Sequence, residues 1–217
     1  MPVNQALDYH QAGYVAQLAS VALGGILLAL ILVAALHLLS PEFSPMRRAM
    51  SDYVHSRYGL LMTAAFAGLG SSLLALAEAF RQIASSALQS SGGLLLATAG
   101  TATLLAGIFP IDNTPDGRFN TARGAAHAAA GFALSPLLVG AMLMLSAPWN
   151  RIGDNDLLQA IALGSAAVNA GAFAALLIVN GIRVPIGGIG QRVFMALVCI
   201  WLLLTSFRLL MLASAGG

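Results

Sequence analysis

The chain has 217 residues, of which 59% are hydrophobic and only 8% are charged. A typical soluble domain carries about 25% charged residues, so this composition excludes an ordinary water-soluble domain and indicates a protein whose solvent is the lipid bilayer. The formal net charge is +2 and all ten basic residues are arginine. We attribute the absence of lysine to a compositional bias of the genome, and we do not expect nucleic acid as a partner.

Six apolar segments are each long enough to cross a bilayer, which takes about 20 residues. Every backbone polar group inside a bilayer needs an internal partner, so each segment is predicted to be a helix. The fold class is therefore all-α, a polytopic membrane protein with a bundle of six transmembrane helices, and residues 1–217 form a single domain. The predicted spans are residues 17–39, 58–80, 92–109, 124–147, 157–179 and 191–213.

Arginines are distributed unevenly between the two sides of this predicted bundle. Seven lie in or beside the loops that join spans one and two, three and four, and five and six, whereas Arg81 and Arg151 lie on the opposite side. The positive-inside rule then places these three loops in the cytoplasm of a bacterial inner membrane and both termini outside. If the arginines belong to a functional site, however, their number is not an independent measure of topology.

Carboxylates and imidazoles gather in the same loops. Asp52 and His55 lie in the first of them, Asp112 follows the third span, and His127 lies one turn into the fourth. These groups can transfer protons, so we predict Asp52, His55, Asp112 and His127 as candidate catalytic residues. The alternative is structural: Ser51 or Asp52 caps a helix, Asp112 caps a helix or pairs with Arg118 or Arg123, and His127 bonds to a backbone carbonyl.

Six loop arginines are candidates for binding the phosphate of a lipid head group, since guanidinium pairs with phosphate through parallel hydrogen bonds. They are Arg47, Arg48, Arg57, Arg118, Arg123 and Arg183. Three glycines, Gly187, Gly188 and Gly190, precede the last span, with Arg192 at its start. This pattern indicates either a weak phosphate-binding turn or a flexible turn.

Three polar residues fall within the predicted spans. Glu78 and Arg208 both lie toward the side opposite the polar loops, so we predict an ion pair that neutralises them. Asn169 is expected to hydrogen-bond across a helix interface. The single cysteine, Cys199, lies in the sixth span and cannot form a disulfide within the chain or a cysteine-based zinc site.

Three short motifs stand at the helix ends: Ser51-Asp52-Tyr53 ahead of Tyr58-Gly59, Gly107-Ile108-Phe109-Pro110-Ile111-Asp112, and Gly124-x-x-His127. They resemble a bacterial six-helix membrane family known only as a domain of unknown function, and the similarity in helix count and loop position covers nearly the whole chain. The resemblance implies an inner-membrane protein and no established activity. That family is distantly similar to the Frag/DRAM/Sfk group, whose members include lipid-remodelling factors of GPI anchors, through the Ser-Asp pair after helix one.

A second resemblance concerns Ser51-x-x-x-His55 with Asp112. It is similar to part of the pattern of intramembrane ceramidase-like hydrolases, which combine Ser-x-x-x-His, an Asp and a His-x-x-x-His pair around zinc. Position 131, four residues after His127, is glycine, so the histidine pair is missing. The resemblance implies a zinc site of three ligands, His55, Asp112 and His127. Our main prediction is nevertheless no cofactor, with zinc as the alternative, since the chain has no phosphate-binding loop, dinucleotide or haem-attachment motif.

These features together favour a protein that binds or modifies a membrane lipid at a polar pocket formed by the three loops. As an enzyme it would be a lipid hydrolase or an acyl transferase, but the sequence leaves open whether it is an enzyme. The alternative is a non-enzymatic accessory or assembly subunit that binds a membrane-protein partner or a second copy of itself. A small transporter is disfavoured, because the centres of the spans are nearly all apolar.

Overall fold

The computed structural model describes residues 9–113, 120–146, 164, 167, 171 and 187–215. Throughout these residues the regular structure is helical, without strands, which confirms the all-α prediction. The elements, in chain order, are α1 (Tyr9–Leu39), the 3₁₀ helix η1 (Met50–His55), α2 (Gly59–Ile83), α3 (Ala87–Ile108), α4 (Ala122–Ser146) and α6 (Gly187–Ala215).

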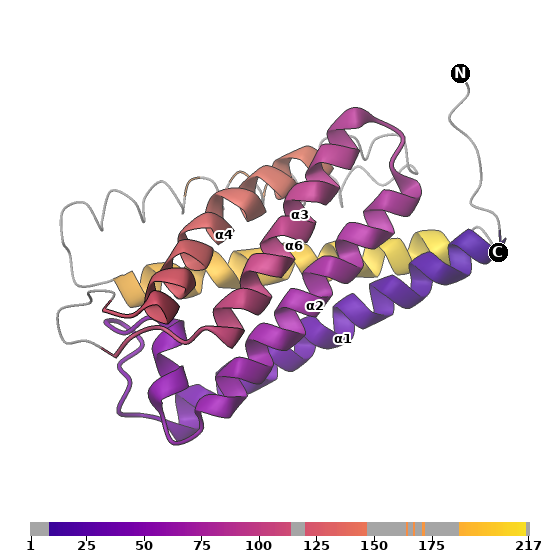
Figure 1. The fold of residues 1–217 in the computed structure, drawn as a ribbon. Helices are drawn as coiled ribbons and strands as arrows, with labels where there is room; N and C mark the ends of the chain where they lie inside the picture. Colours follow the sequence, from indigo (N-terminus) through magenta and orange to yellow (C-terminus); the bar gives the residue numbers. More distant parts are fainter. Residues whose placement is uncertain are drawn as a thin grey trace.

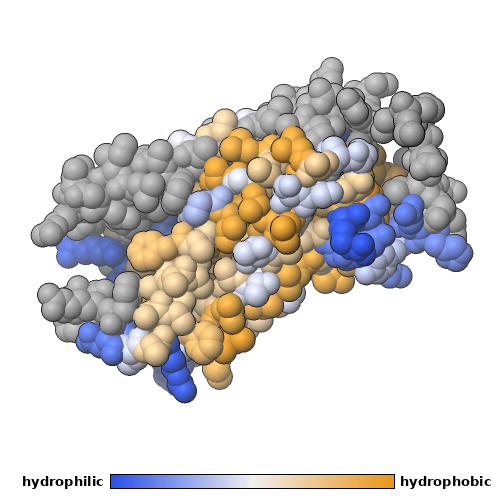
Figure 2. Space-filling view, turned by 45° about the horizontal axis from the view of Figure 1, so that its top comes forward, coloured by the Kyte–Doolittle hydropathy of each residue, from blue (hydrophilic) through white to orange (hydrophobic). Residues whose placement is uncertain are grey.

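Five of the described helices, α1, α2, α3, α4 and α6, are long and apolar enough to cross a membrane. The protein is therefore a multi-pass membrane protein. Figure 2 shows apolar residues over the middle of the face in view, with the most hydrophilic residues toward the two ends of the bundle. These five helices coincide with five of the six predicted spans, whereas the remaining prediction, 157–179, lies outside the described residues apart from three isolated helical positions.

Several helices begin earlier than their predicted spans, with the largest differences at α1 and α3. α1 starts at Tyr9 rather than at 17, because the polar residues His10 and Gln11 are tolerated where the helix leaves the apolar layer. α3 starts at Ala87 rather than at 92, because Ser86 caps it: the Ser86 hydroxyl accepts a hydrogen bond from the Gln89 amide at 3.2 Å. Apolar sequence thus identifies the membrane core of each helix, while capping decides where the helix ends.

Successive helices are neighbours in the bundle: α1 packs on α2, α2 on α3 and α3 on α4, while α6 returns to pack along α1 (Figure 1). Glycines permit close contact at two of these interfaces. A Cβ atom on Gly25 of α1 would lie 2.6 Å from the Gly68 carbonyl oxygen of α2, and one on Gly100 would lie 3.0 Å from the Gly70 carbonyl oxygen. In lipid, this backbone contact supplies the dispersion energy that holds helices together.

The bundle has two chemically different ends. At one end, here called the loop end, lie the α1–α2 connection with η1, the described ends of the α3–α4 connection, and the first turn of α6 (Figure 1). The opposite end carries the first turns of α1 and the last turns of α6. The polar loops one–two and three–four therefore do share one side of the bundle, as their positions in the sequence predict.

The predicted Glu78–Arg208 ion pair is wrong. Glu78 instead binds Arg81 of its own helix, with an Arg81 Nε to Glu78 Oε2 distance of 2.6 Å, and also accepts from Gln82. Residues three and four apart lie on one face of a helix, so the local pair forms without any contact between helices. Arg208 is buried within α6, and Asn169 lies outside the described residues.

Candidate functional site

Asp52 stabilises the 3₁₀ helix that follows α1. Its carboxylate accepts a hydrogen bond from the Ala49 amide at 3.2 Å and lies 3.8 Å from the Arg48 guanidinium. The first amides of a helix have no partner within it, and an aspartate near the N-terminus supplies one. The structural alternative predicted for Asp52 therefore holds, and its carboxylate charge is directed at Arg48.

Tyr53 is the anchor of η1. Its side chain is completely buried, and its ring centroid lies 5.1 Å from that of His37 and 5.4 Å from that of Phe43. The hydroxyl donates to the Phe43 carbonyl oxygen at 3.4 Å. Tyr53 thus holds η1 against the end of α1. Asp52 and His55 belong to the same short helix, so this contact also fixes their positions.

Arg192, in the second turn of α6, joins three segments of the loop end. Its Nε donates to His37 Nε2 of α1 at 2.8 Å. Its Nη1 donates to the carbonyl oxygens of Pro45 and Arg48, both at 2.8 Å, and of Gly188 at 3.0 Å. The sequence prediction noted Arg192 only beside a glycine-rich turn and missed His37, although an ionisable residue inside an apolar span is itself a signal.

The segment before η1 lies directly on the start of α6. A Cβ atom on Gly188 would come within 2.6 Å of the Pro45 and Arg48 carbonyl oxygens, so only glycine allows this approach. The Met50 amide donates to Gln191 Oε1 at 2.8 Å, adding a second link. Gly188 therefore allows close packing of two segments. The sequence predicted instead a phosphate-binding turn or a flexible turn at this position.

Asp112 organises the connection between α3 and α4. Its Oδ2 accepts from the Asn120 and Thr121 amides, both at 2.8 Å, and its Oδ1 accepts from the Thr121 hydroxyl at 2.6 Å. The Thr121 hydroxyl in turn accepts from the Gly124 amide at 3.0 Å, which caps α4. The hydrogen bonds from Thr121 and Asn120 and the nearby His55 hold the pKa of Asp112 below its usual value.

The two histidines of the candidate set both bond to backbone carbonyls. His55 Nε2 lies 2.8 Å from the Ile111 oxygen, which brings the exposed imidazole beside Asp112. His127 is buried, and its Nδ1 lies 2.9 Å from the Ala106 and Phe109 carbonyl oxygens at the end of α3. A ring nitrogen facing two carbonyls must donate, so His127 satisfies acceptors that the end of α3 leaves free.

The structure brings only two of the four candidate catalytic residues close together. His55 and Asp112 lie near one another, whereas Asp52 is bonded within η1 and His127 to the end of α3. No hydrogen bond joins any two of these four described side chains. Over the described ranges, no three His, Cys, Asp or Glu residues are grouped so that they could hold a metal ion, so the arrangement does not support the three-ligand zinc set.

Four of the six candidate head-group arginines are described, and all four are exposed at the loop end: Arg47, Arg48, Arg57 and Arg123. The Arg48 guanidinium lies 5.8 Å from the centre of the Phe43 ring, and that of Arg57 lies 5.5 Å from the centre of the Tyr58 ring. Aromatic contacts of this kind orient a cation without neutralising it. Arg118 and Arg183 lie outside the described residues.

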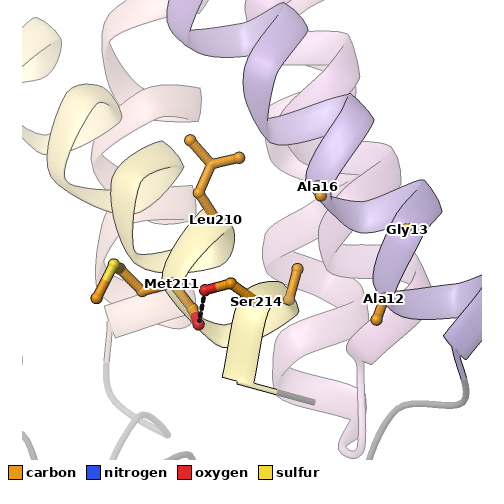
Figure 3. A pocket seen from close by; sticks show the side chains of 7 residues that line it. Ala12, Gly13, Ala16, Leu210, Met211 and Ser214 are labelled. Atoms are coloured by element: carbon orange, nitrogen blue, oxygen red, sulfur yellow. Dashed lines mark hydrogen bonds between the residues drawn. The ribbon is translucent and has the colours of Figure 1, made fainter. Parts of the chain in front are cut away.

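A cavity of about 490 Å³ lies at the opposite end, between α1 and α6 (Figure 3). Its lining is mostly apolar: Ala12, Gly13, Ala16, Leu210, Met211, Ala213 and Ser214. The Ser214 hydroxyl donates to the Met211 carbonyl oxygen of its own helix at 2.8 Å. This cavity is not the polar pocket predicted at the loop end, and that pocket stays a prediction.

The helices and the loop end together define a helical multi-pass membrane protein whose loop end is rich in arginine. Residues 23–208 match the family described as Protein of unknown function (DUF998), and the chain belongs to that family. This confirms the resemblance to a membrane family of unknown function, while the more distant similarity to the Frag/DRAM/Sfk group stays a prediction. Comparison with curated proteins and with solved structures gives no match.

Proposed function

We propose that this protein binds the phosphate of anionic membrane lipids at its loop end. The observation that carries the proposal is the contrast between bases and acids there. Arg47, Arg57 and Arg123 are exposed, while the carboxylates of Asp52 and Asp112 are turned toward internal donors. Of the described carboxylates at this end, only Glu42 is exposed. Exposed guanidinium groups therefore outnumber exposed carboxylates where lipid phosphates lie in a bilayer, in this proposal the bacterial inner membrane.

The proposal concerns binding rather than catalysis. Acid–base work needs a proton donor or acceptor that can reach a substrate. The Asp112 carboxylate holds the start of α4, and His127 is buried against the end of α3. A catalytic role for Asp52, His55, Asp112 and His127, and with it a hydrolase or acyl transferase activity, stays a prediction, as does binding to a protein partner or a second copy.

Native mass spectrometry of the purified protein tests the lipid preference. We expect tighter binding of phosphatidylglycerol than of phosphatidylcholine with the same acyl chains. An arginine near an anionic lipid surface contributes about 1 kcal/mol, so Arg57→Gln should weaken phosphatidylglycerol binding by roughly fivefold. The triple variant Arg47→Gln/Arg57→Gln/Arg123→Gln should weaken it by roughly a hundredfold.

Arg81→Gln is the matched control. Arg81 is also an exposed arginine, but it lies at the end of α2, away from the loop end. Its replacement should leave phosphatidylglycerol binding unchanged. Equal binding of the two lipids by the wild-type protein, or equal losses in the Arg57 and Arg81 variants, would contradict the proposal and favour a role in binding a protein partner.

A further inference from the structure

A polar cluster inside the loop end lies apart from the exposed arginines. It consists of His37 near the end of α1, Tyr53 of η1 and Arg192 of α6. The Arg192 guanidinium carbon lies 5.8 Å from the centre of the Tyr53 ring, whose own centre is 5.1 Å from that of His37. The three side chains thus meet where α1, η1 and α6 converge.

The two ring nitrogens of His37 have fixed and opposite roles. Nδ1 lies 2.7 Å from the Val33 carbonyl oxygen, which can only accept, so Nδ1 carries a hydrogen. Nε2 lies 2.8 Å from Arg192 Nε, which can only donate, so Nε2 presents a lone pair. Together these hydrogen bonds require His37 to be the neutral imidazole with its hydrogen on Nδ1.

No described carboxylate compensates a charge on this ring. The titratable groups of η1 are Asp52, which faces Arg48 and Ala49, Tyr53, and His55, which faces Ile111. Tyr58 precedes α2, whose ionisable residues Glu78 and Arg81 lie at its far end. From α6 the facing group is Arg192, a permanent cation. The α1–α2 connection contributes Glu42 and Arg47, which are both exposed and make no hydrogen bond to the His37 ring. Among the described residues, the charged group bonded to His37 is therefore Arg192, so a proton added to the ring would stand beside another positive charge.

The His37–Arg192 bond also fixes the segment between α1 and η1. Held at Nε by His37, the guanidinium directs Nη1 toward the Pro45 and Arg48 carbonyl oxygens. Its other terminal nitrogen, Nη2, is buried and has no hydrogen-bond partner among the described residues. The closed arrangement therefore leaves one donor of Arg192 unsatisfied, and the bond to His37 helps to hold the guanidinium in that position.

We propose that the His37–Arg192 hydrogen bond is a pH-sensitive latch, which fastens α6 and residues 40–49 to the end of α1 and opens when His37 is protonated. The added proton occupies the Nε2 lone pair, so an N–H group then faces the Arg192 N–H. The hydrogen bond is lost and two cations stand in contact, which separates them. Histidine is the side chain whose charge ordinarily changes between about pH 5 and pH 8. This inference does not rest on the proposed lipid binding.

Hydrogen–deuterium exchange of the full-length protein in lipid nanodiscs tests the latch. Peptides covering residues 40–58 and 187–195 are followed at about pH 7.5 and about pH 5, with rates corrected for the intrinsic effect of pH on exchange. Loss of one charge-assisted hydrogen bond should accelerate exchange roughly tenfold at the lower pH. Unchanged protection of both segments in the wild-type protein would overturn the proposal.

Two variants assign the effect to His37. His37→Gln keeps an acceptor for Arg192 but cannot be protonated, so its protection should no longer depend on pH. His55→Gln, which alters an exposed histidine of the same end, should keep the wild-type response. Loss of the response in His55→Gln, or its persistence in His37→Gln, would show that another group controls the opening.

A measurement on the wild-type protein covers the case in which His37→Gln does not fold. The ring nitrogens of ¹⁵N-labelled histidine report protonation directly by magnetic resonance. The pH midpoint for His37 should coincide with the midpoint of the change in exchange. If His37 stays neutral while residues 40–58 lose protection, the latch is not the cause.

Discussion

At the scale of single residues, the polar groups of the loop end complete the helices that they follow or precede. Each helix end leaves several backbone groups without a partner, and near the membrane boundary water supplies only some of them. Asp112 accepts amide hydrogens ahead of α4, and His127 donates to the carbonyls at the end of α3. A concentration of Asp and His at helix ends is therefore also the pattern that a stable bundle needs.

Asp112 makes this structural role testable through pH. Because its hydrogen bonds lower the pKa of the folded-state carboxyl below the ordinary 3.8, its contribution to stability is present above that value. The contribution is lost as the pH falls through the lower folded-state pKa. Asp112→Asn should reduce Tm by about 2–4 °C at neutral pH, and the difference from the wild type should shrink as the pH falls below the ordinary carboxyl range.

Thermal unfolding in detergent micelles from neutral pH to about pH 2 checks this sign. Glu42→Gln, which changes an exposed carboxylate of the same end, serves as the control and should leave Tm nearly unchanged. A Tm difference for Asp112→Asn that grows at low pH would contradict the capping role. If the variant instead keeps its stability but loses a measured activity, the catalytic hypothesis for Asp112 gains support.

At the scale of elements, the sequence predicts the helices better than it predicts their contacts. Continuous apolar runs locate α1, α2, α3, α4 and α6. A single segment in lipid can satisfy all of its own backbone hydrogen bonds only as a helix. The start of α3 depends instead on the cap at Ser86, and the partner of Arg192 depends on α6 packing beside α1. His37 was missed because it lies inside an apolar run, where hydropathy alone treats it as part of a span.

Interhelical packing gives an element-scale prediction with a built-in control. A Cβ atom on Gly25 would lie 2.6 Å from the Gly68 carbonyl oxygen, whereas one on Gly24 would meet no atom of the described residues within 4 Å. Gly25→Ala should therefore cost about 1–3 kcal/mol of unfolding free energy through overpacking. Gly24→Ala should be neutral or stabilise by up to about 1 kcal/mol through its helix propensity.

Unfolding of both variants by sodium dodecyl sulfate, titrated against mild detergent, measures this difference. The neighbouring positions share one helix and the same substitution, so any general effect of alanine cancels between them. Equal stabilities for the two variants would mean that α1 and α2 do not approach through Gly25. Because α1 also packs on α6, a loosened α1–α2 interface should leave the His37–Arg192 hydrogen bond intact.

At the scale of the whole molecule, the bundle is electrically asymmetric along its axis. Exposed arginines of the α1–α2 connection and of the first turn of α4 share the loop end, whereas the described opposite end of α2 carries the neutral pair of Glu78 and Arg81. The positive-inside rule predicts the loop end in the cytoplasm. Anionic lipids of the cytoplasmic leaflet would favour the same orientation. Both arguments count the same arginines, so the orientation needs a measurement of its own.

Cysteine accessibility tests this orientation, since the native Cys199 is buried and can be replaced by alanine. Ser44→Cys places a thiol at the loop end and Ala87→Cys places one at the other end, both at exposed positions. In spheroplasts, a membrane-impermeant maleimide should label the Ala87 variant, and it should label the Ser44 variant only after permeabilisation. The reverse result would place the arginines outside, where the positive-inside rule cannot explain them. The concentration of arginines at the loop end would then support a ligand site, and native mass spectrometry with the two lipids would test whether an anionic lipid is the ligand.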